Sequence, residues 1–184
     1  INTARETSKE LGKLEGYSEE EAEDVYRKVA LGALKYFILK VDPKKTMMFN
    51  PKESIDFNGN TGPFIQYTHA RICSVLRKAE ELGINLPERI SDDVILSEKE
   101  ISLIQHLAEF AAVIIDAGQQ YSPAIIANYV YDLVKEYNQF YHDFSILKEE
   151  DSDVRIFRLV LSKNVAKIVR LGMKLLGIEV PDRM

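Results

Sequence analysis

Aromatic and cationic side chains follow one face of a predicted helix that begins in the segment Asn60–Arg71. Gly62 can take backbone angles closed to other residues, and Pro63 suits the first helical position, where no N–H is needed. At spacings of three and four, one stripe holds Phe64, Tyr67, Arg71, Ser74 and Lys78. Rings offer stacking faces to unstacked bases, and cations attract phosphates. Such spacing is more typical of rings packed in a core, so by itself it only suggests contact with single-stranded RNA.

A second stripe, made of cations alone, lies on the last predicted helix. Its members are Lys163, Lys167, Arg170 and Lys174, and they lie opposite an apolar face. Residues 155–184 hold seven cations and two anions, whereas the whole chain has a net charge of −5. An acidic total argues against nucleic acid binding, but a basic end permits it on one face. A solvated helix face is the commoner explanation, and charge-driven phosphate contact is the functional one.

Helices follow one another along the chain, and the alternation typical of strands is nearly absent. Capping boxes at Ser18–Glu21 and Ser97–Glu100 mark two helix starts, and Gly83 and Gly177 mark two helix ends. We expect helices over 3–14, 18–41, 63–82, 97–118, 122–143 and 153–176, with a short strand at Thr46–Phe49. The fold class is therefore all-α: a helical bundle over 60–184, preceded by a helical and linker segment over 1–59.

Composition excludes several other kinds of site. Of 184 residues, 46% are hydrophobic and 29% are charged, which is ordinary for a globular protein. The single cysteine, Cys73, rules out an internal disulfide and a cysteine-rich zinc site. Three histidines, His69, His106 and His142, show no metal-binding spacing, and no nucleophile has a base in a known motif. No apolar run of transmembrane length and no signal peptide are expected. We therefore expect no catalytic residue and no metal ligand here.

Three segments resemble arginyl-tRNA synthetases. Residues 57–71, which read FNGNTGPFIQYTHAR, closely resemble the segment that opens the C-terminal anticodon-binding domain of this class I family. The family usually has tyrosine where this chain has Phe64, so the ring is kept and a hydroxyl is lost. Residues 138–141 resemble the family's Asn-x-Phe-Tyr pattern, although Ser145 replaces a proline usual in bacterial members. Residues 176–184 resemble the family's ending, Leu-Gly-x-x-x-Pro-x-x-Met, which implies that Met184 is the final residue and that sequence is missing only before Ile1.

The resemblance implies a helical bundle of the class I synthetase anticodon-binding type that contacts the anticodon arm of arginine tRNA. The residues it points to for tRNA binding are Phe64, Tyr67, Arg71, Lys78, Tyr141, Arg183 and Met184. Phosphate contacts are expected at Lys163, Lys167, Arg170 and Lys174. The two catalytic signature motifs of the family are absent, so this chain should hold no cofactor and should not aminoacylate by itself. The full-length enzyme would use ATP and magnesium to charge arginine tRNA with arginine.

The expected partners are arginine tRNA and the chain's own catalytic domain, in a cytoplasmic monomer with no membrane or DNA contact. Three alternatives stay open at this point. One is the anticodon-binding domain of a related class I synthetase, such as the cysteinyl enzyme. Another is a helical protein-interaction module that binds no RNA, which the acidic net charge would suit. A freestanding hydrolase or transferase would need convergent titratable groups, and the sequence shows none. Exposure of Phe64 and Tyr67 discriminates between RNA binding and the interaction module, because burial of both rings against neighbouring helices would weigh against RNA binding.

Overall fold

The computed structural model describes residues 17–48, 50–87, 89–91 and 93–184. Within these ranges the chain forms six α-helices, one 3-10 helix and no strand. They are α2 (Glu19–Leu39), α3 (Pro51–Ser54), α4 (Gly62–Glu81), α5 (Glu98–Gln119), α6 (Pro123–Asp143), η1 (Ile146–Lys148) and α7 (Ser152–Leu175). The predicted all-α class is confirmed. The helix expected over 3–14 lies outside the described residues, and the expected strand is wrong for Thr46–Met48, which form none.

Local signals set most of the helix ends. Ser18 and Ser97 each accept a hydrogen bond from the backbone N–H of the glutamate three residues on, and that glutamate accepts from the serine N–H in return. Gly83 and Gly177 follow α4 and α7 with left-handed φ angles of 73° and 67°. The end of α5 differs from the prediction: Gly118 stays helical, and Tyr121 takes the left-handed angle instead, with φ 52°.

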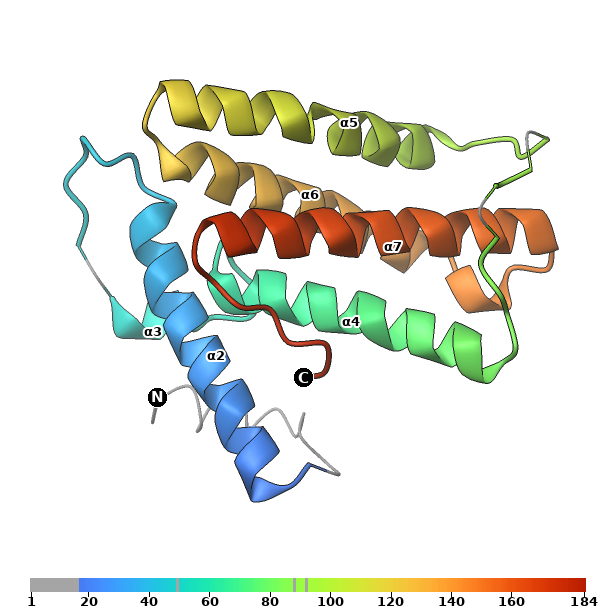
Figure 1. Ribbon diagram of the computed structural model, residues 1–184, viewed down its shortest axis with the longest axis horizontal. Helices are drawn as coiled ribbons and strands as arrows, with labels where there is room; N and C mark the ends of the chain where they lie inside the picture. Colours follow the sequence, from blue (N-terminus) through green and yellow to red (C-terminus); the bar gives the residue numbers. More distant parts are fainter. Residues whose placement is uncertain (1–16, 49, 88, 92) are drawn as a thin grey trace.

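The helices α4, α5, α6 and α7 form a bundle around one core (Figure 1). Its fully buried side chains include Ile65, Ile72, Leu103, Leu133, Tyr137, Phe140, Val165 and Met173. The α2 helix crosses the first turns of α4 at one end of this bundle. A smaller cluster of Val25, Val29 and Phe57 lies at that crossing, and Tyr67 and Met184 pack against it. The chain after α7 starts beside α2 and folds back along α4, away from the first turns of that helix.

Two glycines let the backbones of α2 and α4 touch. A Cβ atom added at Gly62 would lie 2.5 Å from the carbonyl oxygen of Gly32, which is closer than real Cβ atoms come. A Cβ at Gly32 would lie 2.5 Å from the amide nitrogen of Gln66. That amide is fully buried and donates to the carbonyls of Lys28 and Glu179. Gln66 therefore ties α4 both to α2 and to the segment that follows α7.

A buried ion pair joins α5 to α7. Arg158 donates to the Glu100 carboxylate at 2.8 Å, and Glu100 is only 1% exposed. The same guanidinium donates to Glu149 and lies 4.4 Å from the centre of the Phe144 ring. Burial alone would raise the pKa of Glu100, but hydrogen bonds from Arg158 and Ser97 outweigh it and hold the pKa below its usual value. Glu100 therefore stays charged inside the bundle.

The outer side of α5 is apolar and exposed. Ile101, Ile104 and Ile115 are between 38% and 61% exposed, although the opposite side of the helix packs on α6 and α7. By length and composition alone, α5 is the one helix of the described chain that could cross a membrane. From the sequence we expected no apolar run of that length. Here α5 is an element of the bundle, and its buried side carries Leu103 and Phe110.

Candidate nucleic-acid interface

A cavity of about 630 Å³ lies between α4, the end of α6 and the last residues of the chain. Its lining consists of Tyr17, Tyr67, Ala70, Arg71, Ser74, Val75, Arg77, Lys78, Glu81, Tyr141, Leu147, Arg183 and Met184. Six of the seven residues that the sequence pointed to for tRNA binding therefore meet here. They come from positions up to 117 residues apart, and the last two residues of the chain, Arg183 and Met184, form part of the lining. We call this cavity the cup.

Three planar groups form one wall of the cup. The Arg71 guanidinium lies 4.8 Å from the centre of the Tyr67 ring and 5.3 Å from that of Tyr141. Arg71 also donates a hydrogen bond to the Asn138 side-chain oxygen at 2.5 Å. Asn138 is itself fixed, because its amide nitrogen donates to Thr68 Oγ1 and to the Val134 carbonyl. The guanidinium is thus held between two rings before any ligand binds.

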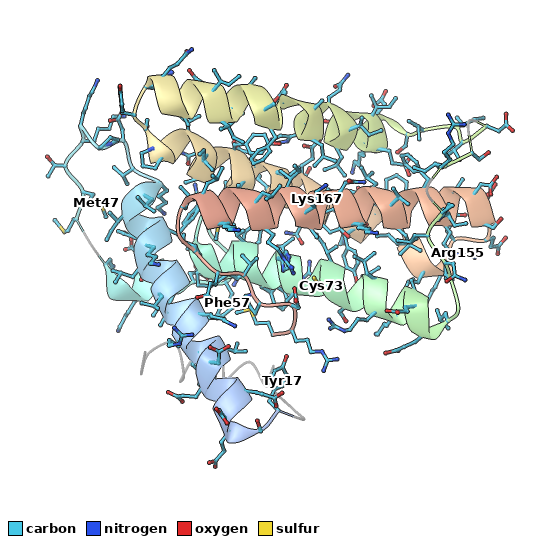
Figure 2. The ribbon with its side chains drawn as sticks, viewed as in Figure 1. Tyr17, Met47, Phe57, Cys73, Arg155 and Lys167 are labelled. Carbon is cyan, nitrogen blue, oxygen red and sulfur yellow. The ribbon has the colours of Figure 1, made fainter. Side chains whose placement is uncertain are left out.

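The remaining charges of the cup are mostly positive. Arg77, Lys78 and Arg183 join Arg71 around the cavity, and Glu81 is the one acidic side chain among the described residues of its lining. The chain is acidic overall, so this local excess of cations departs from the rest of the molecule. Tyr17 adds a hydroxyl that is buried and lacks a hydrogen-bond partner among the described residues (Figure 2). Rings and cations in one hollow suit a base with its attached phosphate.

Phe64, the seventh predicted residue, does not line the cup. Its ring lies 5.9 Å from that of Tyr131 on α6 and packs against the main core. Phe64 comes one turn before Tyr67, and the helix rotation carries it to the edge that α6 covers. The side chains of Phe64 and Tyr67 are both partly exposed, so neither is buried as a pure core residue would be.

The basic stripe of α7 is divided in two by the structure. Lys163, Lys167 and Lys174 are exposed, and Lys167 is labelled on α7 in Figure 2. Arg170 is instead engaged: it pairs with the Asp182 carboxylate, and its Nε donates to His69 Nε2 at 3.4 Å. A second cavity, of about 590 Å³, lies between α4 and α7 and is lined by Lys163, Arg170 and Arg77 among others.

The residues of the cup and its support that the sequence did not point to include Tyr17, Arg77 and Asn138. A signal for Arg77 was present, because Tyr67, Ala70, Ser74, Arg77 and Glu81 continue the spacing of three and four. The small Ala70 and Ser74 in the middle of that series leave room for the hollow. Asn138 and Tyr17 lie outside α4, and no local sequence pattern predicts that they belong to this site.

His69, Cys73 and Asp182 bring three potential metal ligands within 4.8 Å of one another. The surroundings oppose a cation there. The Arg170 guanidinium contacts both the Asp182 carboxylate and His69 Nε2, and Arg77 donates to the Asp182 carbonyl oxygen at 3.0 Å. Burial also raises the pKa of the Cys73 thiol to about 11, so the thiol stays protonated. His69, Cys73 and Asp182 are better described as a set of contacts that anchors the end of the chain.

Comparison with known families identifies the class of this protein. The profile of the DALR anticodon binding domain matches residues 65–184, which hold α4 to α7, most of the cup and the segment that closes it. The chain belongs to the DALR anticodon-binding domain family. Every residue that the sequence pointed to lies inside this match except Phe64, which precedes it by one position.

Within this family the relatives are arginyl-tRNA synthetases, as the sequence resemblance indicated. The chain is 72% identical over all of its 184 residues to an arginine–tRNA ligase of Bacteroides fragilis, and 62% identical to that of Porphyromonas gingivalis. It spans 31% of the length of each of these relatives. The structure superposes along its whole length on the arginyl-tRNA synthetase of Thermus thermophilus, with a TM-score of 0.86 at 30% identity and 30% of that chain covered. For the Plasmodium falciparum enzyme the TM-score is 0.83, at 28% identity and with 32% of that chain covered.

Proposed function

We propose that this chain binds the anticodon arm of an arginine tRNA through the cup, as the anticodon-binding part of an arginyl-tRNA synthetase. The observation that carries the proposal is the cup itself. Tyr67, Arg71 and Tyr141 stack at its wall, inside a family whose description is anticodon binding. An anticodon base splayed out of its loop would enter the cup and stack, and the surrounding cations would hold its phosphates.

The dimensions and charge of the cup support this proposal. Its volume lies in the range usual for sites that enclose a small planar ligand. Arg71 has the flat, delocalised charge that stacks on bases and reads their edges, and the exposed Lys78 and Arg183 suit phosphate contact. Met184 packs beside Tyr67 and supplies an apolar surface to a bound base. A protein-interaction face would not need four cations inside one hollow.

The test is binding of this chain to an arginine tRNA anticodon stem–loop at low and at moderate salt. A stem–loop with its central anticodon base changed is the matched ligand. Loss of affinity with the changed base would support readout of a base in the cup. Equal binding to both ligands would contradict base readout and leave a charge-driven surface. Failure to bind either ligand, repeated with the intact enzyme, would contradict the proposal and favour a protein partner.

Lys167→Ala should weaken binding of the same stem–loop modestly and should make binding less dependent on salt. Lys167 is exposed on α7, and each phosphate contact that is lost lowers the slope of log affinity against log salt by about 0.7 to 0.9. Affinity measured between low and moderate salt gives this slope. Lys44→Ala is the control, because Lys44 is equally exposed but lies in the loop after α2, away from α7. A slope unchanged from the parent would exclude phosphate contact at Lys167.

The activity of the whole protein follows from its relatives and is proposed on that ground. A full-length arginine–tRNA ligase would bind ATP and magnesium in its catalytic domain and join arginine to its tRNA. This chain would contribute anticodon recognition, and engagement of the anticodon would help place the acceptor end in that catalytic domain. We further propose a cytoplasmic monomer whose other partner is that catalytic domain.

A further inference from the structure

The segment after α7, residues 177–184, has no regular secondary structure, yet four of its eight carbonyl groups lie within hydrogen-bond distance of a side-chain nitrogen. Side chains donate to them in sequence order. Lys35 of α2 donates to the Gly177 carbonyl, and Gln66 of α4 donates to that of Glu179 at 2.8 Å. His69 Nδ1 lies 3.0 Å from the Pro181 carbonyl, and Arg77 Nη1 lies 3.0 Å from that of Asp182. Donors on two helices thus take the place of a neighbouring strand.

Asp182 is the centre of this arrangement. Its carboxylate pairs with Arg170 of α7, while its carbonyl oxygen accepts from Arg77 of α4. The carbonyl of Pro181 can only accept, so Nδ1 of His69 carries the ring proton and Nε2 accepts from Arg170. His69 is 1% exposed, and burial lowers its pKa, which keeps the ring neutral in this role. One aspartate therefore connects the segment to both helices that flank it.

The two residues that follow Asp182 are Arg183 and Met184, and both line the cup. Nothing else in the segment reaches that cavity, so their placement depends on how the chain is fixed just before them. Met184 packs against the cluster of Val25, Val29 and Phe57, where α2 crosses α4. In Figure 2 the segment crosses α4 near the labelled Cys73, whose thiol donates to the Asp182 carboxylate.

We propose that His69, Arg77, Arg170 and Asp182 are positioning residues for RNA recognition: they fasten residues 177–184 so that Arg183 and Met184 complete the cup. This inference rests on the proposed function, because it assigns to these residues a part in RNA binding without direct contact with RNA. It also changes the expected role of Arg170, whose charge serves Asp182 and not a phosphate. Release of the segment would open the cup on one side and lower affinity.

Asp182→Lys gives a test, because a positioning role for Asp182 and a surface that binds RNA by charge alone predict opposite changes in RNA affinity. The lysine would face Arg77 and Arg170, and like charges in contact drive the segment away. We expect RNA affinity to fall by about tenfold, the scale of a strongly unfavourable charge pair. A surface that binds RNA by charge alone would instead bind more tightly, because the variant gains two positive charges. Glu81→Lys is the matched control. It makes the same change of charge in the lining of the same cup, but at a residue outside the segment 177–184.

Arg170→Glu combined with Asp182→Lys restores an ion pair with its signs exchanged. If Arg170 serves only to hold the segment, this double variant should regain most of the lost affinity. A phosphate contact by Arg170 would make the double variant weaker than Asp182→Lys alone, and that result would overturn its role as a positioning residue. Asp182 and Arg170 are both exposed, so these variants should fold.

Methyl NMR reads the segment directly and needs no RNA. The chain has four methionines; Met184 reports the segment, and the fully buried Met173 reports the core. In Asp182→Lys the Met184 methyl signal should move and sharpen while that of Met173 stays, and the double variant should reverse the change. An unmoved Met184 signal would show that Asp182 does not hold residues 177–184 in place. A moved signal with unchanged RNA affinity would show that the position of this segment does not matter for RNA recognition. If the parent chain binds no RNA, the proposed function fails, whereas the NMR result still decides the fastening.

Discussion

Tyr67→Ala and Tyr141→Ala are each expected to weaken binding of the anticodon stem–loop by about 1–3 kcal/mol, the usual cost of losing a ring that stacks on a base. The double variant should cost less than the sum of the two. Both rings flank Arg71, at 4.8 and 5.3 Å, so either loss also frees the guanidinium from its place. Affinity for the stem–loop, measured by titration at fixed salt, gives all three values.

Folding has to be separated from recognition in this experiment, because Tyr67 also packs edge-on against Phe57 at 6.4 Å. Tyr67→Leu keeps an apolar side chain at that position and removes only the ring face. It should bind RNA about as weakly as Tyr67→Ala while losing less stability. Tyr121→Ala is the matched control, since that ring is 89% exposed in the turn before α6 and should not affect binding. Unchanged affinity in a folded double variant would refute stacking in the cup.

Arg158→Met should lower the free energy of unfolding by about 3–5 kcal/mol, the usual cost of breaking a buried ion pair by removing one partner. Glu100 is 1% exposed and would be left charged without its partner, and Glu149 would lose a second bond. Denaturant unfolding, followed by circular dichroism, measures the loss. Because Arg158 and Glu100 do not line the cup, the effect should be on stability and not on RNA binding.

Two further variants show whether the unpaired charge of Glu100 causes the loss of stability in Arg158→Met. Lys163→Met makes the same kind of change at an exposed position of α7 and should cost less than about 0.5 kcal/mol. Combining Arg158→Met with Glu100→Gln removes the stranded charge and should recover part of the loss, because a neutral amide is far cheaper to bury. If the double variant is no more stable than Arg158→Met, the cost lies in lost packing over the Phe144 ring instead.

The helices could be predicted from the sequence because their ends are set by local chemistry. Ser18 with Glu21, and Ser97 with Glu100, satisfy backbone donors within one turn, and this does not depend on the rest of the fold. The end of α5 could not be predicted in the same way. A Cβ atom added at Gly118 would meet nothing within 4 Å, so no contact requires glycine there, and Tyr121 takes the left-handed angle after α5 instead.

The cup was only partly predictable, for a physical reason. The spacing on α4 shows which side chains share a face, but it does not show which neighbouring helix covers each edge of that face. Phe64 and Tyr67 are equivalent by spacing, yet Tyr131 of α6 covers one and the cup exposes the other. Asn138 lies 67 residues from Arg71 in the sequence, and the hydrogen bond between them exists only after folding. The family resemblance supplied Tyr141 and Met184, which spacing alone could not have joined to α4.

The contact between Gly32 and Gly62 limits how the recognition bundle could be transferred to another protein. In a chimera that joins the recognition bundle to a foreign scaffold, a splice at residue 60 would discard α2 and with it the Gly32 backbone against which Gly62 lies. Gln66 would lose one of its two carbonyl partners, and the cluster against which Met184 packs would be gone. A transplant that preserves RNA recognition therefore has to carry α2 with the bundle, and a host helix in its place would need glycine where α4 crosses it.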